Sequence, residues 1–324
     1  MKVAIIVPYF GTLPNYFQLF LDSCASNPKF EWLIFSDDTT RFHYPKNVHF
    51  TKMSFQECRE LVQSKFEFKI ELMQPQKLCD YKCAYGLIFE NFLDKYDWWG
   101  HCDLDQIFGD LDAFVTDEML NNYDRIGSLG HLTLYRNTVE NSQEFKRTLN
   151  NRKRYREVFT TSKGCAFDEW LPDNVNDLYI QSGLPIILDN FGADINPYRT
   201  QFSLVKFDMA EHQYVKSNIK NSIFMVENGK LLQIYSEGHQ LKKVEYPYVH
   251  LQKRKMKDKR SDLSSKDYYI VPNSFVDKKK EPMKVLAKSK KWRLLNYQYF
   301  KVKIQSFRYR IENGDWQFSN VFKI

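Results

Sequence analysis

The sequence lacks the long apolar segments that anchor proteins in a bilayer. No stretch reaches about 18 apolar residues, the length that a helix needs to cross a membrane. The apolar run at residues 3–10 is interrupted by Pro8 and carries no cleavage-site pattern, so we expect no secretory leader. None of the six cysteines forms a CxxC pair, which favours reduced thiols in a cytoplasmic protein.

Acidic residues become scarce toward the C-terminus. Residues 251–324 hold 20 Lys and Arg against 7 Asp and Glu, whereas the first 250 residues hold 27 against 33. The net charge of +7 therefore conceals a slightly acidic body and a strongly basic tail. Aromatic residues are abundant (26 Phe, 20 Tyr and 6 Trp), so the 324 residues can build a substantial core in one large domain or in two.

Strands and helices are expected to alternate in the first part of the chain. Strand-prone apolar runs alternate with helical periodicity, and Ser54 with Glu57 predicts a capping box. This order implies an α/β protein with a parallel sheet, whose ligands bind beyond the carboxyl ends of the strands. The expected strands are 2–10, 31–35 and 47–53, and the expected helices are 13–24 and 54–66.

Two groups of side chains end the first two strands at this ligand edge. Pro8, Tyr9 and Phe10 end the first strand, and Asp37 and Asp38 follow the second. An aromatic ring there could cover a nucleobase, and a carboxylate could accept hydrogen bonds from a ribose hydroxyl or a base N–H. The alternative is that the aromatic residues belong to the core and the two acids begin a turn.

The stretch YDWWGHCDLDQIFGDLD, residues 96–112, contains the most informative pattern. An apolar strand is expected to end in Asp103 and Asp105, whose side chains share a face while Leu104 turns into the core. Two neighbouring carboxylates repel each other unless a cation lies between them. A hard divalent ion such as Mg²⁺ or Mn²⁺ fits, and a diphosphate could complete its coordination. A solvated turn after the strand is the alternative.

The string WGHCDLD at 99–105, followed by IFG at 107–109, resembles the DxD segment of GT-A glycosyltransferases. It is similar, more closely, to a family of bacterial glycosyltransferase-like proteins of capsule and exopolysaccharide biosynthesis. The resemblance covers about residues 1–255 and implies a GT-A-like, Rossmann-type mixed sheet, mainly parallel and flanked by helices. The supporting segments are VPYFG, WLIFSDD, KLCDYKCAYG, GHLTLYRN and YVHLQKRKM.

The resemblance implies a set of metal and phosphate ligands. His250 matches a late histidine that joins Asp103 and Asp105 around the metal in many GT-A enzymes, with His239 as the competing candidate. Lys253, with its neighbours Arg254 and Lys255, is expected to meet the leaving diphosphate.

The resemblance also implies contacts to the donor. On a helix expected at 77–93, Lys77 would meet phosphate and Asp80 a sugar or ribose hydroxyl, while Lys82 is expected to be an ordinary exposed charge. His131, Thr133 and Arg136 are further candidates for donor phosphate or sugar hydroxyls, although a structural role is the commoner one for a lone histidine. Gly86 within the helix indicates close packing.

In inverting GT-A enzymes a carboxylate some tens of residues beyond the DxD deprotonates the acceptor hydroxyl. Asp168 or Glu169, beside Trp170, fits that role, whereas a retaining reaction needs no dedicated base. Residues 190–220 are expected to form an irregular segment that could close over a substrate. Asn228 and Gly229 predict a hairpin turn between two strands, and residues 245–251 are expected to form the last strand of the body.

The basic tail suggests a separate extension. We expect a catalytic domain at 1–255 and a basic, aromatic-rich extension at 256–324. Nucleic acid, an acidic polymer or an anionic membrane would each suit the extension, but no nucleic-acid-binding motif is present. The mixture of bases and aromatics favours the membrane surface, which implies a cytoplasmic protein on the inner face of the cell membrane. Packing against the acidic body is the alternative.

The expected function is therefore a metal-dependent glycosyltransferase of surface polysaccharide synthesis. It would use Mn²⁺ or Mg²⁺ and a nucleotide-diphosphate sugar, with a UDP-sugar expected first, and a glycan or lipid-linked acceptor. One alternative is a metal-dependent phosphodiesterase that uses the same carboxylates. The other is a non-catalytic carbohydrate- or membrane-binding protein on a transferase-like fold.

Overall fold

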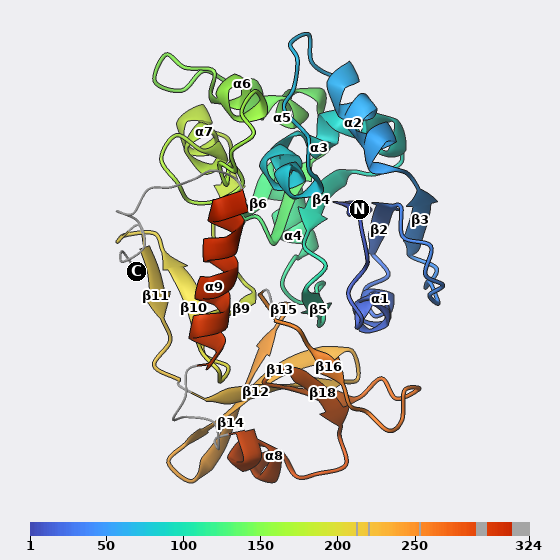
Figure 1. Cartoon of the computed structure of the whole chain (residues 1–324), viewed down its shortest axis with the longest axis vertical. Helices are drawn as coiled ribbons and strands as arrows, with labels where there is room; N and C mark the ends of the chain where they lie inside the picture. The colour runs from blue at the N-terminus through green and yellow to red at the C-terminus, as the bar shows by residue number, and fades with distance from the viewer. Residues whose placement is uncertain (212, 220, 253, 290–296, 313–324) are drawn as a thin grey trace.

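The computed structural model describes residues 1–211, 213–219, 221–252, 254–289 and 297–312, which form three β-sheets and a layer of short helices (Figure 1). In the first sheet, of order β3-β2-β1-β4-β7-β6-β8, the strands β3, β2, β1 and β4 are parallel, and β7 is antiparallel to both its neighbours. The predicted α/β class, with a mixed and mainly parallel sheet, is confirmed. The bounds are β1 Val3–Pro8, β2 Phe30–Ser36, β3 Val48–Lys52, β4 Trp98–Cys102, β6 Arg125–Leu129, β7 Leu132–Arg136 and β8 Ile186–Ile187.

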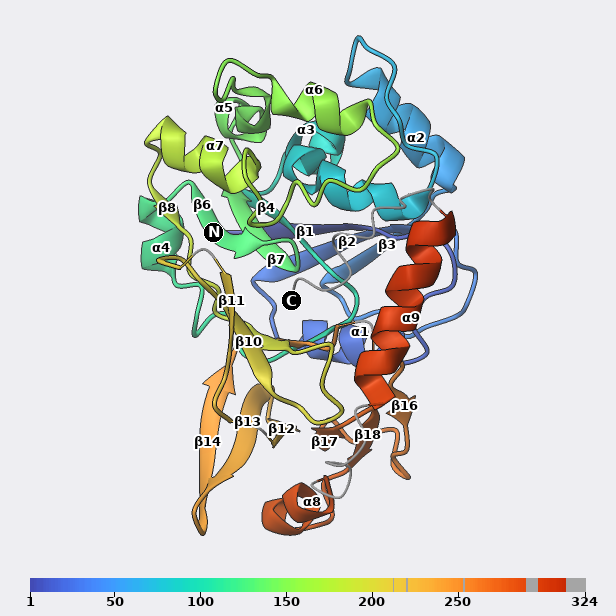
Figure 2. The ribbon, with the colours of Figure 1, turned by 60° about the vertical axis from the view of Figure 1, so that its left-hand side comes forward.

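Helices cover both faces of the first sheet, so its central strands are buried (Figure 2). α1 and α4 pack on the face that carries Trp32 and Trp98, and the remaining helices up to α7 pack mainly on the face that carries Trp99. The capping box of α2 is confirmed, since Ser54 accepts from the N–H of Glu57 and Glu57 accepts from the N–H of Ser54. The bounds are α1 Phe17–Ala25, α2 Phe55–Ser64, η1 Pro75–Ala84, α3 Tyr85–Ile88, η2 Glu90–Phe92, α4 Asp117–Asn122, α5 Val139–Ser142, η3 Glu144–Lys146, α6 Arg154–Phe159 and α7 Val175–Ser182.

The second sheet continues directly from the first. β4 of the first sheet is followed after three residues by β5, which is the edge strand of the second sheet, of order β11-β10-β9-β15-β5. The expected metal-binding turn is therefore the connection between the two sheets. The bounds are β5 Gln106–Phe108, β9 Ala193–Ile195, β10 Leu204–Asp208, β11 Gln213–Lys216 and β15 Tyr248–His250.

The third sheet joins strands from both sides of residue 255. β12 pairs with β13 across the predicted hairpin, where Asn228 and Gly229 both have positive φ, and β12 also pairs with β17. Positive φ at both residues is the geometry of a type I′ turn. The sheet has the order β14-β13-β12-β17-β18-β16. The bounds are β12 Ser222–Glu227, β13 Lys230–Glu237, β14 Gln240–Tyr246, β16 Lys257–Asp258, β17 Tyr268–Val271 and β18 Ser274–Asp277.

Two helices follow the third sheet, α8 Pro282–Ser289 and α9 Tyr297–Glu312. α9 touches the body through Val302, which is 2% exposed, and through Tyr299, whose ring centroid lies 6.0 Å from that of Tyr198. Among the helices of the described residues, none combines the length and the apolar character that crossing a membrane requires.

Three expectations about local structure were wrong. Residues 77–93 do not form one α-helix, because η1 is a 3₁₀ helix with three residues per turn, and α3 and η2 are single turns. Residues 190–220 are not irregular throughout, since β9, β10 and β11 lie within them. The strand that ends at His250 is not the last of the body, because β16, β17 and β18 follow it in the third sheet.

The predicted close packing of Gly86 is confirmed and gives a stability test. A Cβ at this position would overlap the buried indole ring of Trp99. We expect Gly86→Ala to lower the free energy of unfolding by about 1–3 kcal/mol in urea titration, because the indole ring has no room to shift. Unchanged or higher stability would contradict this, since intrinsic helix propensity alone favours alanine by about 1 kcal/mol.

Candidate functional site

Asp103 and Asp105 lie in the turn that links the first and second sheets. Their side chains are 32% and 27% exposed, whereas Leu104 between them is 5% exposed and packs in the core. The predicted alternation of two accessible carboxylates around a buried leucine is confirmed. The turn is fixed to the second sheet because the N–H of Leu251 donates to the carbonyl of Asp105 at 2.8 Å.

The second sheet brings His250 to these two carboxylates. β15 pairs antiparallel with β5, which sets His250 opposite Gln106, one residue beyond the turn. His250 Nε2 lies 3.2 Å from Asp105 Oδ1 and 3.9 Å from Asp103 Oδ2. The three residues expected to bind metal, separated by up to 147 positions in sequence, therefore meet at one point. His239, the competing candidate, lies in the turn between β13 and β14 and outside this group.

Asp194 holds the other side of the imidazole ring of His250. β9 pairs in parallel with β15 and sets Asp194 beside His250, and Asp194 Oδ1 accepts from His250 Nδ1 at 2.9 Å and from Gln252 Nε2 at 2.7 Å. A carboxylate can only accept, so Nδ1 carries the hydrogen and Nε2 points its lone pair or proton at the two aspartates. Asp194 is not among the residues predicted from the sequence, because residues 190–220 were expected to be irregular. The sequence signal that could have identified it is a single acidic residue between two apolar ones, Ala193 and Ile195.

The aspartates around His250 outnumber the positive charges beside them. Burial disfavours the charged imidazolium, but Asp105 and Asp194 outweigh it and raise the pKa of His250 well above its usual value. Burial likewise opposes ionisation of Asp105, yet His250 outweighs it and lowers the pKa of Asp105. The positive charge of the protonated His250 thus reduces the repulsion between these carboxylates, as a bound cation would.

The donor set fits a hard divalent cation. One ligand atom each from Asp103, Asp105 and His250 lies within 4.8 Å of the other two. Two carboxylates and one imidazole, with Asp194 orienting the imidazole from behind, suit Mn²⁺ or Mg²⁺ and leave coordination positions for phosphate oxygens.

His131 stacks on His250 at the inner side of the group. The ring centroids lie 4.7 Å apart, and His131 Nδ1 lies 2.8 Å from the hydroxyl of Tyr248. Burial and then the charge of His250 lower the pKa of His131 to about 4, so it is neutral near pH 7. Its Nε2 is buried without a hydrogen-bond partner within the described residues, and His131, Asp194 and His250 form a second group of ligand atoms within 4.8 Å.

Lys82 is a central cation of the site, and its expected exposure was wrong. It is 6% exposed, and its Nζ lies 2.8 Å from Asp103 Oδ1, 3.2 Å from Asp168 Oδ2 and 2.9 Å from the carbonyl of Gly130. Burial disfavours its charge, but Asp103 and Asp168 raise its pKa well above the usual value. The 3₁₀ geometry of η1 directs Lys82 away from the face of Lys77 and toward the end of β4.

Asp168 and Glu169 lie beside this cation. Asp168 is 6% exposed, and burial, opposed by Lys82, raises its pKa. Glu169 Oε1 accepts from the N–H of Gly130 at 3.2 Å, and Oε2 accepts from the hydroxyl of Tyr214 at 3.2 Å. Burial, reinforced by the charge of Asp168, raises the pKa of Glu169 to about 8. Asp168 is thus joined to Asp103 through Lys82, and Glu169 follows it in the chain.

Lys77 and Asp80 bind each other and the backbone that precedes Asp168 and Glu169. Lys77 Nζ lies 2.7 Å from Asp80 Oδ2 and donates to the carbonyl of Lys163. Asp80 in turn accepts from the N–H groups of Cys165 and Phe167 at 3.0–3.1 Å. Their charged atoms therefore bind each other and the chain that leads into Asp168, rather than pointing at open space.

The aromatic residues after β1 separate into two environments. Phe10 is 7% exposed and packs on Phe55, so it belongs to the core. Pro8 ends β1 and is partly exposed. Tyr9 is also partly exposed, and burial followed by the charges of Asp105 and Asp38 raises its pKa. Tyr9 is therefore the more accessible of the two aromatic residues after β1, and its hydroxyl donates to the carbonyl of Thr12 at 3.2 Å.

The acids after β2 bind the backbone of the loop after β1. Asp37 Oδ1 accepts from the N–H of Gly11 at 2.7 Å, and Asp38 accepts from the N–H groups of Leu13 at 2.7 Å and Thr40 at 2.6 Å. They hold the loop after β1 at the carboxyl edge of the sheet, where Asp37 is exposed and Asp38 is partly exposed.

Arg136 is not brought to the group. It lies at the opposite end of β7, paired with Trp98 at the start of β4, and its guanidinium binds Asp124 and the carbonyls at the end of α4. Arg254 is 3% exposed and binds the carbonyls of residues 196, 199 and 200, so it anchors the chain after β9. Lys253 lies outside the described residues.

Comparison with known proteins gives a family without an assigned role. The model of a family described as "Family of unknown function (DUF6625)" matches residues 5–279. A search of the curated proteins finds no match. A crystal structure of the galactosyltransferase LgtC with donor and acceptor sugar analogues aligns with a TM-score of 0.34 and 10% identity, over 60% of this chain and 76% of that chain. An active-site mutant of LgtC aligns with the same score and identity, over 60% and 75%. A likeness at this TM-score carries no argument about function.

The contact between Asp194 and His250 gives a test of the metal group. We expect Asp194→Ala to weaken Mn²⁺ binding about 10–100-fold in calorimetric titration, because the imidazole loses the acceptor that orients it. Asp194→Asn keeps an acceptor oxygen and is expected to lose less. Equal Mn²⁺ affinity in wild type and Asp194→Ala would contradict the assigned arrangement.

Proposed function

The chain belongs to this family of unknown function, and from the geometry of its site we propose that it is a metal-dependent glycosyltransferase of the GT-A type. It would move a sugar from a nucleotide-diphosphate donor to a glycan or lipid-linked acceptor in the synthesis of a bacterial surface polysaccharide. The observation that carries the proposal is the meeting of Asp103, Asp105 and His250 at the carboxyl edge of a parallel sheet.

The donor would bind across this edge. Asp103, Asp105 and His250 would hold Mn²⁺ or Mg²⁺, which supplies positive charge to the diphosphate as it leaves. Tyr9, which is partly exposed after β1, would cover a nucleobase, and the exposed Asp37 would accept a hydrogen bond from a ribose hydroxyl. A UDP-sugar is the first donor to test.

Lys82 would separate the donor side of the site from the acceptor side. Its ammonium group contacts both Asp103, a proposed metal ligand, and Asp168. Its positive charge reduces the repulsion between the carboxylates of Asp103 and Asp168. Removal of Lys82 would leave the buried Asp168 without its cation and Asp103 with one positive partner fewer.

Glu169 is the better of the two candidates for the base of an inverting reaction. Asp168 is nearly buried and paired with Lys82, whereas the side chain of Glu169 is partly exposed and reaches Tyr214 on β11. A carboxyl group whose pKa lies near 8 is a stronger base than an ordinary glutamate once it is ionised.

The proposal includes attachment of α9 to an anionic membrane surface, as an enzyme with a lipid-linked acceptor requires. Phe300, Ile304 and Ile311, spaced along one side of α9, are 62%, 53% and 43% exposed. Lys301 and Arg308 on the same helix supply positive charge. An amphipathic basic helix of this kind binds headgroups of acidic lipids.

The direct test is donor cleavage. The purified protein, given UDP-, GDP- or dTDP-sugars with Mn²⁺, is expected to release free nucleoside diphosphate from one donor class, and EDTA is expected to stop the release. Asp105→Ala should lower the rate about 100-fold or more, because the metal loses a carboxylate ligand. The exposed Asp94→Ala is the matched control. Metal-dependent cleavage of bis(p-nitrophenyl) phosphate, with no nucleotide-sugar turnover, would instead support a phosphodiesterase.

The pKa of Glu169 predicts the pH profile. A base acts only when ionised, so kcat/KM for transfer should rise about tenfold per pH unit below pH 8 and level off above it. Glu169→Gln should remove most of the activity together with this slope. A flat profile from pH 6 to 9 in the wild type would exclude Glu169 as the base.

Vesicle sedimentation tests the membrane contact. The wild type is expected to bind vesicles that contain phosphatidylglycerol and to release them as salt is raised, because the attraction is partly electrostatic. The double variant Phe300→Ser and Ile304→Ser should bind at least about fivefold more weakly. Leu263→Ser, which alters an exposed leucine that is 66% exposed outside α9, should bind as the wild type does. Equal binding by all three proteins would exclude α9 as the membrane contact.

A further inference from the structure

A cavity of about 640 Å³ lies between Trp170, which follows Glu169 in the chain, and the strands β10 and β11 of the second sheet. Its lining includes Ser128, Trp170, Leu188 to Asn190 with Gly192, the strands β10 and β11 with residues next to them, and Gln233 with Tyr246 of the third sheet. The volume falls within the range of roughly 300–1,000 Å³ that small-molecule sites occupy. None of the metal-group residues lines it, so it is separate from the donor edge described above.

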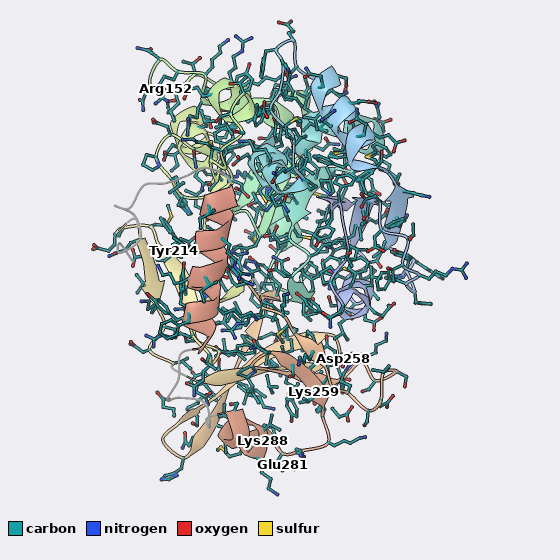
Figure 3. All side chains as sticks on the ribbon, viewed as in Figure 1. Arg152, Tyr214, Asp258, Lys259, Glu281 and Lys288 are labelled. Carbon is teal, nitrogen blue, oxygen red and sulfur yellow. The ribbon has the colours of Figure 1, made fainter. Side chains whose placement is uncertain are left out.

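One wall of the cavity is aromatic and leads to the candidate base. The rings of Trp170 and Phe207 stack in parallel, with centroids 5.1 Å apart and an interplanar angle of 3°. Tyr214 meets Phe207 edge-on at 5.2 Å, and its hydroxyl donates to Glu169. Tyr214 lies on β11 at the side of the molecule, where it is 49% exposed (Figure 3). The wall that Trp170 and Phe207 form is thus connected to Glu169 through Tyr214.

Another wall of the cavity is connected through side-chain contacts to His250 of the metal group. Asn190 lines the cavity, and its Oδ1 accepts from the hydroxyl of Tyr248 at 3.0 Å. The same hydroxyl lies 2.8 Å from His131, which stacks on His250. Gly192 makes this approach possible, because a Cβ at that position would overlap the ring of Tyr248.

The cavity also contains a buried polar atom that lacks a partner. Gln233 is 1% exposed, and its Nε2 donates to Ser222 at 3.0 Å. Its Oε1 is buried and accepts no hydrogen bond from any of the described residues. A buried acceptor of this kind costs about 1–3 kcal/mol unless a ligand or a water molecule satisfies it.

This lining matches one class of ligand. Flat indole and phenyl rings cover the C–H face of a sugar ring, while carboxylates, amides and hydroxyls accept and donate at its edge. Asp189, Asn190, Asp208 and Gln233 supply such polar groups here. A lipid chain would leave these groups unsatisfied, because it offers them no hydrogen bonds.

We propose that this cavity binds the acceptor as a saccharide, with Trp170 as the stacking surface and Gln233 as a hydrogen-bond acceptor for a sugar hydroxyl. The proposal rests on the proposed function in one respect, since the hydroxyl that reacts would be presented to Glu169. The acceptor and the donor then enter from different sides, with Lys82 between them.

Saturation-transfer NMR with lactose, maltose, cellobiose and N,N′-diacetylchitobiose tests the cavity, on the full chain with and without Mn²⁺ and UDP. We expect at least one disaccharide to bind the wild type, and to bind Trp170→Ala and Gln233→Leu at least tenfold more weakly. Phe92→Ala, an aromatic residue that is 40% exposed elsewhere, should bind as the wild type does. Ser217→Phe fills the cavity without removing core packing, so it tests the site if Trp170→Ala does not fold.

The outcomes separate the two proposals. If no disaccharide binds the wild type, or if all variants bind equally well, the cavity is not a saccharide site. If UDP and Mn²⁺ do not bind the wild type, the proposed transferase function fails, while the titrations without metal still decide the cavity. Loss of saccharide binding in Trp170→Ala with unchanged affinity for Mn²⁺ and UDP supports the acceptor site specifically.

Discussion

The contact of His250 with Asp194 on one side and Asp105 on the other is the constraint on which the rest of the site depends. Three strands of the second sheet, β5, β15 and β9, bring these side chains together in register. Because Asp194 accepts a hydrogen bond from the Nδ1–H of His250, Nε2 is directed at the two aspartates of the turn. The proton that His250 binds there occupies the position in which a divalent cation would relieve the same repulsion.

A second cation organises the opposite side. Lys82 links Asp103 to Asp168, and Asp80 holds the backbone that leads into Asp168 and Glu169. The acids therefore form two clusters, one around His250 and one around Lys82, which share Asp103. In the proposed transferase the donor would bind at the metal group, and the acceptor would bind in the cavity beside Trp170, with Glu169 near both.

The sequence predicted those parts of the structure that depend on local chemistry. Alternation gave the strands and the buried Leu104, Ser54 and Glu57 gave a helix start, and Asn228 with Gly229 gave a hairpin. The aspartates and His250 were recognised through the resemblance of their motifs. Lys82 and Asp194 were missed, since their roles depend on a 3₁₀ helix and on a strand of three residues. Arg136 was misjudged because the direction of β7, which no local pattern encodes, sends it to the far end of the sheet.

The central claim is that Asp103, Asp105 and His250 bind a divalent cation that holds a nucleoside diphosphate. The most direct measurement is the anomalous scattering of crystals grown with Mn²⁺ and UDP, recorded on both sides of the manganese absorption edge. The account predicts a single strong peak within about 2.0–2.3 Å of a carboxylate oxygen of each aspartate and of His250 Nε2, with diphosphate density beside it. UDP density without that peak, or a peak at another position, would contradict it.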